Sequence, residues 1–120
     1  MRPIIEVIVL LAGFLLLSPS SYAANDGNTL LEWCADAEKS MDNPNASVDY
    51  QKAAFCGGMV EGVRGTQMSM SGQFKACIPV ISNGQAIRVV LAYLRKNPAR
   101  LHENQVHLVM DAFKDAYPCK

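Results

Sequence analysis

The sequence predicts an all-α fold, a compact four-helix domain stapled by two disulfides. Three observations lead to this prediction. Apolar residues recur at intervals of three and four, the spacing of one face of a helix. Clusters of asparagine, proline and glycine divide this pattern into four segments. The chain also has four cysteines, and an even number in an exported chain indicates disulfides.

The segment before the helices has the layout of a secretory signal peptide. Arg2 supplies a basic start, residues 4–17 are apolar apart from Glu6, and small residues lead up to Ala23. The apolar run is shorter than the roughly 20 residues that a membrane-spanning helix needs, although an uncleaved anchor is the alternative. We predict cleavage after Ala23, a single mature domain over residues 24–120, a periplasmic location and no membrane attachment after signal removal.

The first predicted helix begins at Thr29 and ends at the break over residues 42–45. Thr29 and Glu32 have the spacing of a capping box, in which each side chain binds a free backbone amide of the first turn. Leu30 and Cys34 fall on one stripe of this helix, so we expect that stripe to face the core.

The second predicted helix covers residues 47–64 and ends at Gly65. It contains interior glycines, each of which costs about 1 kcal/mol relative to alanine. Gly58 and Gly62 share one helical face next to Cys56. We therefore predict that these two glycines let the helix pack closely against a neighbouring element, with a ligand-binding glycine site as the alternative.

Residues 65–76 are predicted to form the longest loop, and they contain three large apolar residues, Met68, Met70 and Phe74. Methionine-rich surfaces adapt to binding partners, so these residues are candidates for partner binding. The alternative is that they fold back over the core.

The third and fourth predicted helices meet near Asn97. Ser82 and Gln85 have capping-box spacing at the start of the third helix. Asn97 is placed to cap the fourth helix, with Pro98 at its first position and Pro118 at its end.

Four cysteines allow three pairings. If consecutive helices form antiparallel hairpins, Cys34 comes level with Cys56, and Cys77 and Cys119 lie at the same end of the second hairpin. This reasoning favours the pairs Cys34–Cys56 and Cys77–Cys119.

The charge of the chain is balanced but unevenly distributed. Eleven basic and eleven acidic residues give zero net charge, which argues against a nucleic-acid partner. Residues 24–51 hold six acidic residues and one lysine, whereas residues 52–120 hold nine basic and four acidic ones. Either the two parts pair internally or the second part offers a basic face to an acidic partner. The candidate basic residues surround one turn: Arg95, Lys96, Arg100 and His102.

The sequence contains no arrangement typical of an enzyme. All four cysteines are assigned to disulfides, and no nucleophile elbow or phosphate-binding loop is present. His102 and His107 are five residues apart, which on a helix does not bring two metal ligands to one face. We predict no catalytic residue, no metal and no cofactor.

Four segments, "GNTLLEWC", "FCGGMVEGV", "CIPVISNGQAIRVVLAYLRKNPARLH" and "DAYPC", resemble in order the Tai/Rap family of type VI secretion immunity proteins. The resemblance extends from Gly27 to Cys119, and Met59 departs from it because the family usually has an aromatic residue there.

The resemblance implies a small, helical, disulfide-bonded periplasmic protein, often a homodimer, that is not an enzyme. Such proteins bind and block peptidoglycan amidase effectors and so protect the cell wall of the producer. Two alternatives have a different function: a periplasmic chaperone of the acid-stress type, and a helical binding module with another partner.

Overall fold

The computed structural model describes residues 25–120, which form four α-helices and two short 3-10 turns. The helices are α2 (Gly27–Asp42), α3 (Tyr50–Met68), α4 (Asn83–Lys96) and α5 (Gln105–Ala116), and the turns are η1 (Gly72–Phe74) and η2 (Pro98–Arg100). Within this part of the chain there is no β-strand, so the all-α prediction is confirmed. The predicted signal peptide and its cleavage site after Ala23 lie outside the described residues.

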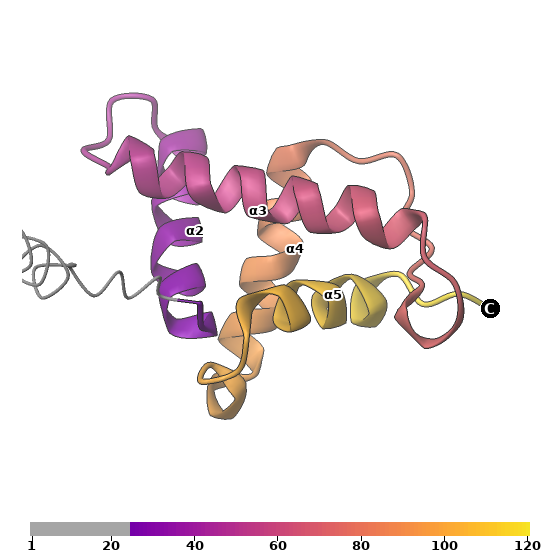
Figure 1. The fold of residues 1–120 in the computed structure, drawn as a ribbon. Coiled ribbons are helices and arrows are strands. Elements are labelled where there is room, and N and C mark those ends of the chain that lie inside the picture. Colours follow the sequence, from indigo (N-terminus) through magenta and orange to yellow (C-terminus); the bar gives the residue numbers. More distant parts are fainter. Residues whose placement is uncertain (1–24) are drawn as a thin grey trace, which may run out of the picture.

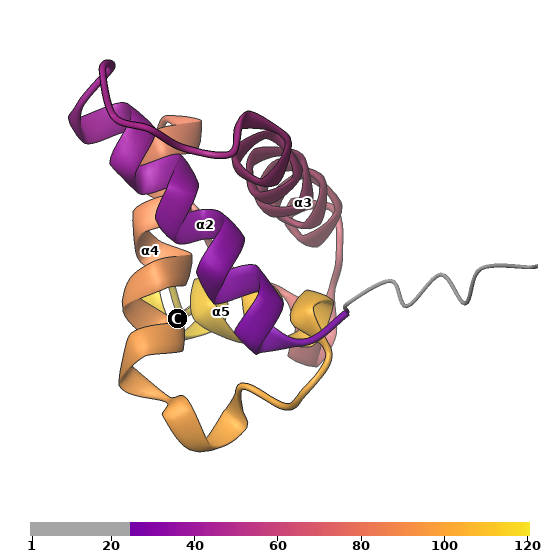
Figure 2. The ribbon, with the colours of Figure 1, turned by 90° about the vertical axis from the view of Figure 1, so that its left-hand side faces the viewer.

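Two helices run alongside each other and two cross them. Helices α2 and α4 form the first pair, and α3 and α5 cross this pair and lie next to each other (Figure 1). A view from the side shows α3 nearly end-on beside α2 (Figure 2). The antiparallel hairpin assumed for the first two helices is therefore wrong, because α3 crosses α2. All four helices contribute fully buried side chains to one core, among them Leu30, Val60, Leu91, Leu94, Leu108 and Phe113.

The two disulfides have the pairing that the sequence favoured. Cys34 in α2 is bonded to Cys56 in α3, with their α-carbons 5.1 Å apart, and both are fully buried. Cys77 is bonded to Cys119, which ties the segment before α4 to the end of the chain. Both of these residues are exposed. The first bond therefore lies in the core, and the second lies at the surface.

The cap of helix α2 lies three residues earlier than expected. This cap is Asp26, whose carboxylate accepts a hydrogen bond from the Thr29 amide at 2.9 Å. The backbone amide of Gly27 also donates to the Glu103 carbonyl at 3.1 Å, so the chain before α5 holds the start of α2. The predicted cap at Thr29 is wrong because this earlier aspartate was available.

Helix α3 does not end at Gly65 but continues to Met68. Gly72 is the only residue within 25–120 with a positive φ, so Gly65 does not adopt the left-handed conformation of a terminating glycine. The extra turn places Gln67 in a fully buried position, where its side chain bonds two other segments. These tertiary hydrogen bonds stabilise the turn that local sequence rules would have ended.

Helix α4 begins as expected, with the Ser82 hydroxyl accepting a bond from the Gln85 amide at 3.1 Å. The predicted start of the last helix, with Asn97 as its cap and Pro98 as its first residue, is wrong. The Asn97 side chain donates to the Tyr93 carbonyl at 2.8 Å and so closes α4 instead of opening α5. Pro98 begins the turn η2, and α5 starts at Gln105 with Asn104 as its cap.

Candidate partner-binding surface

Many residues of the unevenly distributed charge form ion pairs within the domain. Acidic side chains of α2 face basic side chains of α3 and α4: Glu32 pairs with Lys52, Asp42 with Arg88, and Glu38 with Arg95. The last two pairs have oxygen–nitrogen distances of 2.6 and 2.7 Å. The acid-rich first part of the chain is thus matched to the base-rich second part, which supports internal pairing over an open basic face.

The predicted basic turn is only partly available for binding. Arg100 donates to the carboxylate of Glu103 at 2.6 and 2.7 Å and to Asp111 at 2.7 Å. These hydrogen bonds raise the pKa of Arg100, and they hold the pKa of Glu103 below its usual value. Arg95 is also paired, whereas Lys96 and His102 are exposed. The cluster is therefore largely a set of internal contacts around η2.

The apolar loop residues are exposed. Met68, Met70 and Phe74 retain 54%, 36% and 50% of their accessible surface, so they do not fold back as a cover on the core. Gln67 holds this loop in place, because its side-chain amide donates to the Phe74 carbonyl at 2.9 Å and to the Met110 carbonyl at 3.0 Å. One buried side chain therefore connects the end of α3, the loop and α5.

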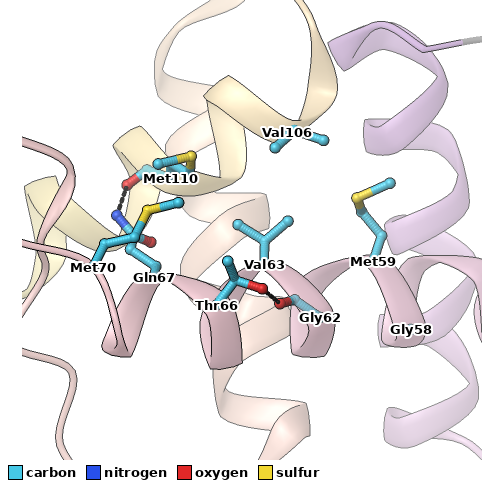
Figure 3. A pocket seen from close by; sticks show the side chains of 9 residues that line it. All are labelled: Gly58, Met59, Gly62, Val63, Thr66, Gln67, Met70, Val106 and Met110. Atoms are coloured by element: carbon cyan, nitrogen blue, oxygen red, sulfur yellow. Dashed lines mark hydrogen bonds between the residues drawn. The ribbon is translucent and has the colours of Figure 1, made fainter.

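A groove of about 340 Å³ lies between α3 and α5, and we refer to it as the α3–α5 groove (Figure 3). None of its lining residues is charged. They are Gly58, Met59, Gly62, Val63, Thr66, Gln67, Met70, Val106 and Met110. Of the predicted partner-binding residues, only Met70 lies here.

The structure corrects the role assigned to Gly58 and Gly62. A β-carbon built on either glycine would meet no atom within 4 Å, so neither one allows a close approach of another helix. Both glycines instead line the α3–α5 groove. A tightly packed glycine is instead Gly27, where an added β-carbon would overlap Leu108 Cδ1 and lie 3.0 Å from the Leu101 carbonyl oxygen. The sequence spacing showed that the two glycines share one face of the helix, but it did not show whether that face contacts another helix.

The Gln67 amide leaves one buried acceptor unused. Its nitrogen is fixed by the two carbonyl oxygens to which it donates, so the oxygen Oε1 must point the other way. That oxygen is buried and has no hydrogen-bond partner. Leaving a buried acceptor unsatisfied costs about 1–3 kcal/mol. Gln105 Oε1 is also unpartnered, but Gln105 does not line this groove.

A second hollow, of about 270 Å³, adjoins the groove at Met110. It brings together two predicted residues from different segments, Phe74 of the loop and Arg100 of the basic turn. His107, Asp111 and Lys114 also line it. Met68, Arg95, Lys96 and His102 line neither hollow.

Sequence reasoning missed most of the groove residues. Met59, Val106 and Met110 come from two helices that are far apart in the sequence, and only the fold brings them together. The signal that could have found the site is the combination of small residues at 58, 62 and 66, which share one face of α3, with methionines nearby. Among residues 25–120, no three histidine, cysteine or carboxylate side chains are grouped so that they could hold a metal ion.

The comparison with protein families gave one match. The model described as Rap1a immunity proteins matches residues 26–119, which include all four helices and both disulfides. No curated protein and no solved structure matched the chain.

Proposed function

Since this chain belongs to the Rap1a immunity protein family, we propose that it protects its producer by binding and blocking a peptidoglycan amidase effector of a type VI secretion system. Membership over residues 26–119 is the observation that carries the proposal. The chain is an immunity protein and not an enzyme, so its function depends on a protein–protein surface. The exposed Met70 and Phe74, beside an uncharged groove, offer apolar area for such a surface.

We infer that the protein acts in the periplasm after removal of residues 1–23. The two disulfides support an oxidising compartment, because such bonds form and persist in exported proteins. Among residues 25–120, no helix has the length and apolarity to cross a membrane. The family resemblance also suggests a homodimer, and light scattering coupled to gel filtration would measure the mass of the oxidised chain.

The test uses the oxidised chain 24–120 and each amidase effector of the source cell. Cleavage of purified peptidoglycan is followed by mass spectrometry of the released peptides, and binding is measured by calorimetry. We expect one amidase to be inhibited at a stoichiometric ratio. The control is the same chain reduced and alkylated, which should lose inhibition as it loses its disulfides. If no amidase is bound or inhibited, the proposal is refuted.

The acid-stress chaperone is a different function that the same preparation can test. A chaperone of this type should suppress the aggregation of unfolded client proteins at pH 2–3 without a defined stoichiometry. We expect no such activity, since family membership points to one specific effector.

A further inference from the structure

We propose that the α3–α5 groove binds an amphipathic helix of the effector, which inserts an uncharged face and donates one hydrogen bond to Gln67 Oε1. The inference rests on the proposed function, since it names the surface through which the immunity protein holds its effector. The occupant is argued from four features of the groove.

The first feature is the glycine face of α3. Gly58 and Gly62 are exposed, and an added β-carbon would meet no atom within 4 Å, so the packing of this domain does not require glycine at either position. Alanine would suit an exposed helix better. Glycine instead allows a partner backbone to approach α3 more closely than any side chain would permit.

The second feature is the buried amide of Gln67. Its oxygen is the unsatisfied acceptor at the end of the groove, and a donor on the partner would complete its hydrogen bonding. Figure 3 shows the Met70 side chain beside this amide. Because methionine has three rotatable side-chain bonds, Met70 can rotate to admit the donor.

The third feature is the lack of free side-chain donors, which favours a helix over an extended segment. An extended segment brings a backbone donor or acceptor at every residue, and each of these needs a partner when buried. The groove side chains have no donor left for such a segment, since the Thr66 hydroxyl donates to the Gly62 carbonyl at 2.9 Å and the Gln67 amide donates to the Phe74 and Met110 carbonyls. A helix satisfies its own backbone and presents only side chains. The uncharged lining likewise excludes a charged face.

The fourth feature is the set of methionines around the groove. Met59 lies toward one end, and Met70 and Met110 lie at the other (Figure 3). Flexible methionine side chains reshape to fit the apolar anchors of a bound helix, the mode in which amphipathic helices dock in grooves.

The experiment compares matched variants for binding to the inhibited amidase. Gly62→Leu fills the groove, whereas Gly65→Leu places the same side chain on the same helix at an exposed glycine that does not line it. Calorimetry should show at least a tenfold loss of affinity for Gly62→Leu and a change of less than threefold for Gly65→Leu. Far-ultraviolet circular dichroism verifies that both variants are folded.

A second measurement uses the wild-type chain and does not depend on the folding of a variant. With 13C-labelled methionine methyl groups, addition of the amidase should shift the signals of Met59, Met70 and Met110. The signal of Met41 should not move, because Met41 lies at the end of α2, away from the groove residues. Hydrogen exchange on the amidase identifies the segment that becomes protected on binding.

The outcomes separate the two proposals. If the amidase binds but the groove methyl signals stay in place and Gly62→Leu binds like Gly65→Leu, the groove inference is overturned and the proposed function stands. A protected segment that is not helical overturns the choice of occupant. If no amidase binds the wild-type chain, the proposed function fails and this inference fails with it.

Discussion

Replacing glycine by alanine at two positions should change stability in opposite directions. Gly27→Ala places a methyl group against Leu108 and the Leu101 carbonyl. Leu108 Cδ1 is the end of a flexible side chain and can shift, whereas the Leu101 carbonyl oxygen at 3.0 Å and α-carbon at 3.1 Å belong to the backbone. The carbonyl accepts hydrogen bonds from the backbone and side chain of Asn28, both at 3.1 Å, so it is fixed. Overpacking of this kind costs about 1–3 kcal/mol.

Gly62→Ala meets none of these obstacles. Its methyl group has no neighbour within 4 Å, and Gly62 does not have a positive φ. The substitution removes conformational freedom from the unfolded chain and should stabilise the fold by about 0.4–1 kcal/mol. The two variants should therefore differ by about 1.4–4 kcal/mol in the free energy of unfolding, by combining these ranges.

Urea unfolding followed by circular dichroism measures both variants against the wild type. Each 1 kcal/mol corresponds to a shift of about 4–8 °C in the melting temperature of a domain this size, so heating gives an independent measurement. An unchanged Gly27→Ala variant would refute the packing assigned to Gly27. A destabilised Gly62→Ala variant would refute the statement that this face of α3 is unoccupied.

Three further predictions concern a disulfide, a pH response and a cap. Replacing Cys77 and Cys119 together by serine should lower the free energy of unfolding by about 2–4 kcal/mol and speed hydrogen exchange near the chain end, with little change at the core. Because Arg100 lowers the pKa of Glu103, the stability from this pair is present above the usual carboxyl pKa of 4.5 and is lost as the pH falls below it. Glu103→Gln should flatten that loss in acid titrations followed by circular dichroism, and an unaltered titration would contradict the assignment. Asn104→Ala should destabilise the domain by about 1 kcal/mol in urea because α5 loses its cap, and a neutral result would count against this start for the helix.

The number of helices could be predicted because local signals were strong. Apolar spacing identified the buried side of each helix, and Ser82 capped its helix as expected. The pairing matched although its geometric premise was wrong. Cysteines in consecutive helices can meet where the helices cross as well as where they run antiparallel.

The helix ends and the groove could not be predicted because tertiary contacts decide them. Asn97, followed by proline, has the pattern of a helix start. Its side chain instead caps the end of the preceding helix by donating a hydrogen bond to the Tyr93 carbonyl. Gly65 has the identity of a terminator, yet Gln67 extends α3 by bonding to the Met110 carbonyl of another helix. The glycine face of α3 was visible in the sequence, but whether it was covered depended on the crossing of α3 and α5.

The order of the disulfides along the chain has a consequence for biosynthesis. Each bond joins two cysteines that have no other cysteine between them in the sequence: Cys34 with Cys56, and Cys77 with Cys119. A chain that is threaded across a membrane from its amino end exposes the first pair before the second has emerged. An oxidase that links thiols in their order of arrival therefore produces the native bonds directly. For the proposed export route, we therefore predict that maturation needs a thiol oxidant but no enzyme that reshuffles wrongly paired cysteines.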